Sequence, residues 1–230
     1  MSGLFITGVG TGVGKTLVTT ILCHQLRDLG RSVSALKPVV SGFVDDDPLS
    51  DPALILSSLG VSPTKAAIAS VSPWRFAAPI APHLAARHEG RSVALEDVAR
   101  FCAEPASGPA STRLIEGAGG VMSPICEYAT CIDLIARLAV PVVLVTGTYL
   151  GALSHTLTAL TALKGSAVSV RGIVVSESAD GVGLAETVES LQEFGAADFP
   201  VHPLPRLPGG AVERWRIAPM LTAVCEDGDG

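Results

Sequence analysis

The stretch that decides the fold is Gly8-Val9-Gly10-Thr11-Gly12-Val13-Gly14-Lys15-Thr16, near the start of a 230-residue chain. It follows an apolar strand pattern at Leu4–Thr7 and opens a helical pattern at Thr16–Leu29. The glycines let successive backbone N–H groups point at phosphate oxygens, and the helix adds the positive end of its dipole. In such a loop the lysine reaches the β- and γ-phosphates, and the hydroxyl that follows coordinates Mg²⁺. We therefore predict a nucleoside triphosphate site formed by Gly12, Val13, Gly14, Lys15, Thr16 and Leu17.

The loop is one residue longer than the common phosphate-binding pattern. That pattern has a glycine five residues before Gly14, where this chain has Val9, and Gly8 comes one residue earlier. The plainest alternative is a glycine-rich turn between a strand and a helix that binds no phosphate. The intact Gly14-Lys15-Thr16 end, in its strand-to-helix context, favours the phosphate-binding interpretation.

Strand and helix patterns alternate along the rest of the chain. Strands are expected at 4–7, 32–37, 112–116, 140–146 and 170–175, and helices at 16–29, 52–59, 94–102, 130–138, 151–163 and 184–194. This alternation, with 48% hydrophobic residues, indicates parallel strands covered by helices on both faces. We predict one P-loop NTPase-like α/β domain over residues 1–230, with a mostly parallel sheet in three layers. Residues 39–82 are expected to be mostly loop around one short helix, and the tail from Pro200 shows no clear pattern.

Two charged side chains stand where predicted strands end, Lys37 and Glu116. Ligands of open α/β sheets bind at the carboxyl edge, and a carboxylate there suits Mg²⁺, a hard cation. A lysine there can stabilise charge on a transferring phosphoryl group, and Ser41 offers a hydroxyl nearby. The alternatives are an exposed turn or helix-capping acid for Glu116 and a solvated strand-end lysine for Lys37.

A third metal ligand is sought among the aspartates that follow. Asp51 precedes Pro52 and an apolar run, so it has the pattern of a helix N-cap near the site. The run Asp45–Asp47 is more typical of a solvated turn. We therefore predict that Mg²⁺ is held by Thr16, Asp51 and Glu116.

Composition argues against several classes of partner. The net charge is −6 and no cluster of lysine and arginine stands out, so nucleic acid is not an expected partner. The longest apolar run, around Ala139–Val145, is far shorter than a membrane span, and no membrane partner is expected. The five cysteines are scattered without a CxxC pair, which indicates reduced thiols and a cytoplasmic protein.

Several segments, taken in order, resemble the dethiobiotin synthetase family. They are the extended P-loop from Thr7 to Thr16, Lys37-Pro38-Val39 with Ser41-Gly42, Ser50-Asp51, Phe76-Ala77 with Pro79 to His83, Glu116 to Gly120, and Leu150-Gly151 with His155. Single motifs of this set occur in other P-loop families, whereas the ordered set is specific. The similarity runs over most of the first 175 residues.

This resemblance implies an ATP- and Mg²⁺-dependent cyclo-ligase. In that reaction CO₂ forms a carbamate on one amine of 7,8-diaminopelargonate, and ATP phosphorylates the carbamate. The second amine then closes a ureido ring, which gives dethiobiotin, ADP and phosphate. The resemblance assigns catalytic roles to Lys15, Lys37 and Thr11, and substrate contacts to Thr11, Lys37 and Ser41.

The resemblance also extends to the two ends of the bound molecules. The nucleotide would contact Glu116, Gly117, Ala118 and Gly119, and its base would lie at Ser176, Glu177, Pro205, Arg206 and Leu207. The substrate carboxylate would meet a helix start at Gly151, Ala152 and Ser154, supplied by the neighbouring subunit of a homodimer. The family often has Asn-Asp where this chain has Ser176-Glu177, and some relatives have Lys at Tyr149. The alternative function is a regulatory P-loop ATPase of the partitioning or septum-placement type, although Gly10 stands where such proteins usually carry a second lysine.

Overall fold

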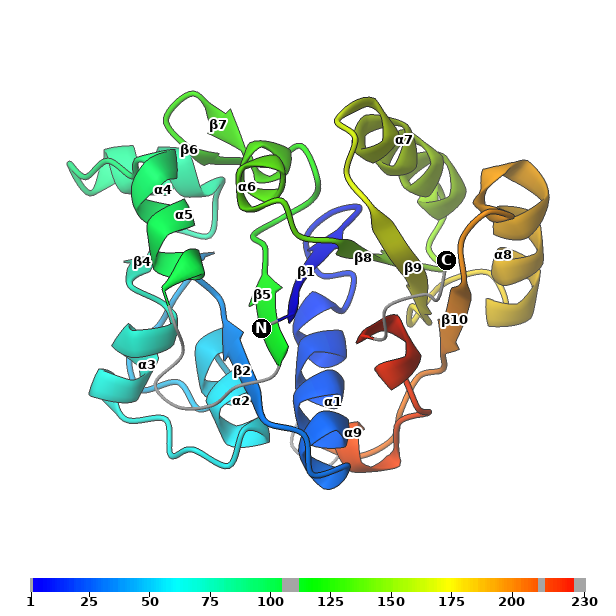
Figure 1. Ribbon diagram of the computed structural model, residues 1–230, viewed down its shortest axis with the longest axis horizontal. Coiled ribbons are helices and arrows are strands. Elements are labelled where there is room, and N and C mark those ends of the chain that lie inside the picture. The colour runs from blue at the N-terminus through cyan, green and yellow to red at the C-terminus, as the bar shows by residue number, and fades with distance from the viewer. Residues whose placement is uncertain (1, 105–111, 211–213, 226–230) are drawn as a thin grey trace.

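The computed structural model describes residues 2–104, 112–210 and 214–225. Within these ranges the main sheet has six strands, all parallel, in the order β10-β9-β8-β1-β5-β2 (Figure 1). Their bounds are β1 Ser2–Gly8, β2 Val33–Leu36, β5 Thr112–Glu116, β8 Val142–Gly147, β9 Val170–Ser176 and β10 Val201–Leu204. The predicted parallel α/β architecture is confirmed.

The central strands are apolar because both faces of the sheet are covered. In β1, Phe5 and Ile6 are both fully buried but belong to different hydrophobic clusters, one on each face of the sheet. Neighbours along β8 alternate in the same way, with Leu144 in one cluster and Val145 in the other. Burial on both faces explains why these strands read as continuous apolar runs.

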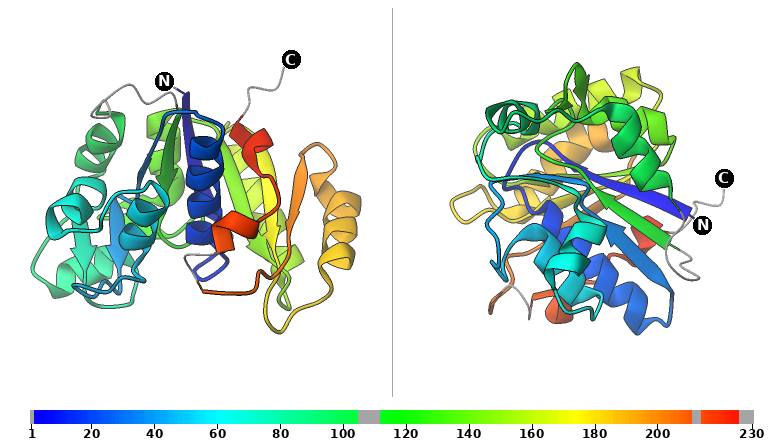
Figure 2. Two further views of the ribbon diagram at one scale, coloured as in Figure 1. Left: turned by 90° about the horizontal axis from the view of Figure 1, so that it is seen from below. Right: turned by 90° about the vertical axis from the view of Figure 1, so that its left-hand side faces the viewer.

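The helices form the two outer layers, which the right-hand view of Figure 2 shows on opposite sides of the sheet. One layer contains α1 Lys15–Asp28, α2 Asp51–Ser58, α9 Arg214–Ile217 and the 3₁₀ turn Thr222–Cys225. The other contains α4 Pro82–His88, α5 Leu95–Ala103, α6 Cys131–Leu138, α7 Ala152–Gly165 and α8 Leu184–Leu191, which continues as a π-helical turn over Gln192–Ala196. The chain therefore has the three layers that the sequence predicts.

The prediction of a mostly irregular segment over residues 39–82 is wrong. Strand β3, Val39–Ser41, pairs in parallel with β4, Trp74–Phe76, and α3, Lys65–Val71, lies between them in sequence. Strands of three residues are too short to show alternation, so pattern reading finds no signal there. This small sheet places Ser41 beside the carboxyl edge of the main sheet.

Two further elements lack a clear sequence signal. Strand β10 contains Pro203, which has no N–H to donate. A sheet tolerates proline in an edge strand, and β10 is at the edge, where β9 is its one partner among the strands described. A short hairpin joins β6, Pro124–Cys126, to β7, Ala129–Thr130. No helix in the described part of the chain is both long and apolar enough to cross a bilayer.

Candidate active site

The order of the strands gathers the predicted site residues at one edge of the sheet. Strand β5 lies between β1 and β2, and Leu36 in β2 is in register with Ile115 in β5. The residues that follow, Lys37 and Glu116, are therefore neighbours at the carboxyl edge although 79 positions separate them in sequence. The glycine-rich loop leaves the same edge at the end of β1.

The loop between β1 and α1 has the backbone that a phosphate cradle requires. Gly12 and Gly14 have φ angles of 77° and 100°, a left-handed conformation that glycine adopts without strain. Helix α1 starts at Lys15 with no side-chain cap, so its first N–H groups are available to an anion. The ammonium of Lys15 folds back to donate to the Gly10 carbonyl oxygen at 2.7 Å.

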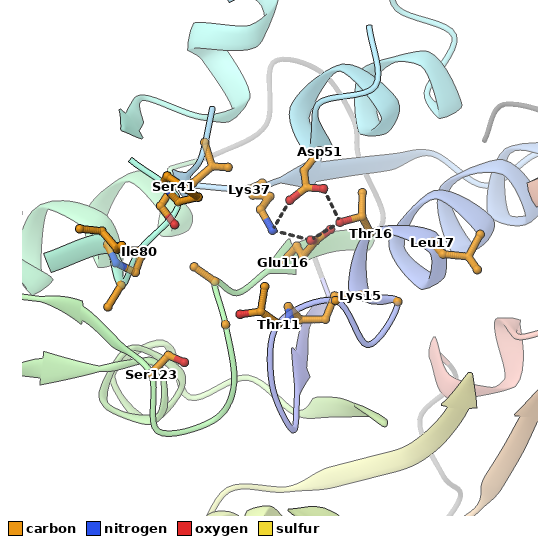
Figure 3. A pocket seen from close by; sticks show the side chains of 18 residues that line it. Thr11, Lys15, Thr16, Leu17, Lys37, Ser41, Asp51, Ile80, Glu116 and Ser123 are labelled. Carbon is orange, nitrogen blue, oxygen red and sulfur yellow. Dashed lines mark hydrogen bonds and ion pairs between the residues drawn. The ribbon is translucent and has the colours of Figure 1, made fainter. Parts of the chain in front are cut away.

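Four polar side chains meet beside the loop, two from the carboxyl edge of the sheet and two from the helix layer of α1 and α2 (Figure 3). The Lys37 ammonium lies 2.6 Å from Glu116 Oε1 and 2.9 Å from Asp51 Oδ2. The Thr16 hydroxyl is 2.7 Å from Glu116 Oε1 and 2.8 Å from Asp51 Oδ1. Lys37 is 4% exposed and Glu116 is fully buried, so this pair is screened little by solvent.

The pKa values of the two lysines are shifted in opposite directions. Burial alone would lower the pKa of Lys37, but the carboxylates of Glu116 and Asp51 hold this pKa above its ordinary value. Burial, reinforced by the charge of Lys37, lowers the pKa of Lys15 to about 8. Burial would raise the pKa of Asp51, whereas the Lys37 ammonium and the Thr16 hydroxyl keep it below its ordinary value.

The oxygen atoms of this cluster suit a magnesium ion. Glu116 Oε2 is buried and has no hydrogen-bond partner among the described residues, although its other oxygen accepts two hydrogen bonds. No group of three His, Cys, Asp or Glu side chains that could hold a metal occurs in the described ranges. Two carboxylates and a hydroxyl fit Mg²⁺, which usually takes its remaining ligands from phosphates and water.

A cavity of about 700 Å³ opens beside these groups. Its lining includes most of the predicted residues: Thr11, Gly12, Gly14, Lys15, Thr16, Leu17, Lys37, Ser41, Asp51, Glu116, Ala118 and Gly119. Val13 is buried behind the loop, and the carbonyl of Gly117 lies 3.4 Å from the Lys37 ammonium. Three further segments of the lining are not among the predicted site residues: Val40, Pro79 to Pro82, and Ser123.

The residues predicted for the base and for the substrate carboxylate lie outside this lining. Ser176 is close to the loop, because a Cβ added at Gly14 would stand 2.9 Å from Ser176 Oγ. Glu177 Oε2 accepts a hydrogen bond of 2.8 Å from the Arg206 N–H, which ties the end of β9 to the segment Pro205 to Leu207. Gly151 precedes α7, with Ala152 and Ser154 in its first turn, while the Tyr149 hydroxyl lies 2.8 Å from His155 Nδ1.

The aspartates near the site agree with the sequence interpretation at Asp45–Asp47 and differ from it at Asp51. Asp51 is the first residue of α2, and Ser50 is its N-cap, because the Asp51 carboxylate turns toward Lys37 and Thr16. The run Asp45–Asp47 forms the expected turn, in which Asp46 pairs with Lys65 and Asp47 accepts from the Leu49 N–H.

Comparison with known proteins identifies the family. An AAA domain model matches residues 2–209. The ATP-dependent dethiobiotin synthetase BioD of Methylobacterium nodulans is 49% identical over 194 residues, which cover 82% of this chain and 86% of that protein. The protein of the same name from Caulobacter vibrioides is 47% identical over 196 residues, covering 84% of this chain and 88% of its own.

Similarity to solved structures is more distant. A chain of the MinC:MinD cell division protein complex from Aquifex aeolicus aligns with a TM-score of 0.56 and 14% identity, covering 90% of this chain and 83% of its own. At that identity the likeness concerns the fold alone. Sequence similarity to the two dethiobiotin synthetases is much stronger and spans most of both chains, so the chain belongs to the ATP-dependent dethiobiotin synthetase family and is an ATP-dependent ligase.

Proposed function

We propose that the chain closes the ureido ring of dethiobiotin from 7,8-diaminopelargonate, CO₂ and ATP. The observation that carries this proposal is the position of Lys37, whose ammonium lies 2.6 Å from Glu116 beside the phosphate loop and faces the same cavity as Lys15. Two negatively charged reactants, a carbamate and a triphosphate, must meet in this reaction. Fixed positive charge between them lowers the repulsion as phosphoryl transfer proceeds.

The reaction needs no protein nucleophile. CO₂ adds to one amine of the substrate with loss of a proton, and a carbamate oxygen attacks the γ-phosphorus to release ADP. The second amine attacks the carbonyl carbon of the mixed anhydride, the C–O bond to phosphate breaks, and a proton leaves the ring nitrogen. Lys15 and Lys37 stabilise the transferring phosphoryl group, while Thr11 and Ser41 hydrogen-bond the carbamate and amines.

The nucleotide is held by the loop residues Gly12 to Leu17 and by the turn Gly117 to Gly119. Thr16, Asp51 and Glu116 would hold Mg²⁺, and the partnerless Glu116 Oε2 supports this assignment. When bound, Mg²⁺ supplies a Lewis acid that neutralises charge on the phosphate oxygens. Ser176 and Glu177, with Pro205 to Leu207, flank the base, which the hydrogen bond between Glu177 and Arg206 supports.

We also infer a homodimer with two shared sites. Gly151, Ala152 and Ser154 lie outside the cavity of their own chain, so the helix start that binds the substrate carboxylate would come from a second copy. Leu150, beside this helix start, is 94% exposed in the single chain, as expected of an apolar side chain that a second subunit covers. Sedimentation at several concentrations measures the mass, and a monomer at micromolar concentration would rule this inference out.

We place the reaction in the cytoplasm. None of the five cysteines, which all lie in the described ranges, forms a disulfide, as is usual in a reducing compartment.

One assay tests the ligase proposal against the alternative of a regulatory ATPase. The protein is mixed with ATP, Mg²⁺, bicarbonate and 7,8-diaminopelargonate, and phosphate release and the mass of dethiobiotin are followed together. A ligase releases phosphate only with the diamine present and in step with the product. Equal ATP hydrolysis without the diamine would instead support the switch-like ATPase.

A further inference from the structure

Ser123 lies in the turn between β5 and β6 and lines the same cavity as the two lysines. Its hydroxyl oxygen accepts a hydrogen bond of 2.7 Å from the Gly120 N–H. Its own N–H donates to the Gly120 carbonyl at 3.0 Å, and its carbonyl accepts from the Cys131 N–H at 2.9 Å. Two hydrogen bonds therefore hold the backbone of Ser123, and one holds its side-chain oxygen, before any ligand binds.

The hydroxyl hydrogen of Ser123 is free for a ligand. The hydrogen bond from the Gly120 N–H uses a lone pair of the oxygen and leaves the hydrogen unused. The described residues provide no acceptor for that hydrogen. Figure 3 shows the hydroxyls of Ser123 and Thr11 directed into the space between them. A Cβ at Gly119 would collide with the Ser123 hydroxyl and would stand 3.8 Å from Thr11 Oγ1, so the two hydroxyls flank one backbone position.

The cavity has two chemically different ends. The loop residues, Asp51 and Glu116 occupy the end that suits phosphate and metal. Away from it, Figure 3 shows Ser41, Ile80 and Ser123, with Thr11 between the two ends. The lining also includes the apolar residues Val40, Pro79, Ala81 and Pro82. The carbamate is the strong hydrogen-bond acceptor at the diamine end of the substrate, because a protonated amine has no lone pair with which to accept.

We propose that Ser123 is a substrate-contacting residue whose hydroxyl donates a hydrogen bond to a carbamate oxygen of the diamine. This inference rests on the proposed function. The oxygen of Ser123 is held in place by the Gly120 N–H, so the hydroxyl is already in position when the carbamate forms and little freedom is lost on binding. Its contact is separate from those of Lys37 and Ser41, which come from other elements.

The test compares Ser123→Ala with Ser123→Thr, which keeps the hydroxyl. For Ser123→Ala we expect the KM for the diamine to rise about tenfold to a hundredfold, as for a lost hydrogen bond to a charged group, with the KM for ATP within about twofold. Ser123→Thr should restore most of the diamine KM. Thr64→Ala is the matched control, because the Thr64 hydroxyl also accepts from an N–H three residues away, that of Ala67, but lies outside the cavity.

The result that overturns the proposal is a Ser123→Ala enzyme with unchanged diamine KM, or with equal rises in the KM for diamine and for ATP. Equal rises would mean that the turn has a structural role only, as would failure of Ser123→Thr to restore binding. If Ser123→Ala melts well below the wild type, Ser123→Cys gives the comparison, since a thiol keeps the shape but donates weakly. Wild-type protein that does not convert the diamine would refute the proposed function itself, and the role of Ser123 with it.

Discussion

Replacement of Lys37 by methionine tests the electrostatic balance of the site. Methionine keeps most of the apolar stem and removes the ammonium that lies between Glu116 and Asp51. Glu116 is fully buried and, of its donors in the described part of the chain, would keep only the Thr16 hydroxyl. Loss of one partner from a buried ion pair costs about 3–5 kcal/mol, and we expect the lower end because Asp51 is partly exposed.

The assay is urea or thermal unfolding at pH 7 without nucleotide. A loss of about 3 kcal/mol corresponds to a fall in Tm of about 6–12 °C for a chain of this length. Lys15→Met is the matched control, because among the described residues the Lys15 ammonium bonds only the Gly10 carbonyl, and burial lowers its pKa to about 8. A folded-state pKa below that of an unfolded lysine means that the charged form opposes folding at pH 7, so Lys15→Met should be neutral or stabilising.

Magnesium gives the same test a second readout. In Lys37→Met the two carboxylates are left without the ammonium, and a divalent cation between them would restore the charge balance. We therefore expect millimolar Mg²⁺ to stabilise Lys37→Met more than the wild type or Lys15→Met. Equal losses of stability in the two methionine variants, or no extra effect of Mg²⁺ on Lys37→Met, would refute this account of the cluster.

Three further outcomes are expected. Glu116→Gln should raise the Mg²⁺ concentration needed for half-maximal turnover, and an unchanged titration would remove Glu116 from the metal site. The affinity for ADP, measured by calorimetry, should fall by up to about tenfold per unit above pH 8, because Lys15 loses its proton there, whereas Lys15→Arg should show no such fall. Four cysteines are buried and Cys225 is partly exposed, so a thiol reagent should modify one group in the native protein and five after unfolding; rapid modification of more than one would contradict the burial.

The sequence predicts those parts of the site whose signal is local. The phosphate loop is recognisable because its glycines, lysine and threonine are adjacent and sit between a strand and a helix. The place of Lys37 and Glu116 at the carboxyl edge follows from strand ends alone. Their direct contact does not, because it depends on β2 being next to β5, and strand order has no signature in either strand.

Elements without a periodic pattern could not be predicted. Strands β3 and β4 are three residues each, and β10 contains a proline that normally argues against a strand. Ser123 was missed for a related reason: a serine after a glycine-rich turn is ordinary, and only the fold brings it opposite Thr11. The N-cap assignment of Asp51 was wrong because tertiary partners outweigh a local capping preference.

The two lysines of the site are not interchangeable, although each contributes one positive charge. Lys37 is held by two carboxylates, so its charge persists whether or not phosphate is present. Lys15 has no carboxylate partner among the described residues, and burial weakens its hold on a proton. An anion at the loop would restore that hold, so the charge of Lys15 is coupled to phosphate binding. Lys37 can therefore receive a carbamate in a site whose charge is already set, whereas Lys15 responds to the nucleotide.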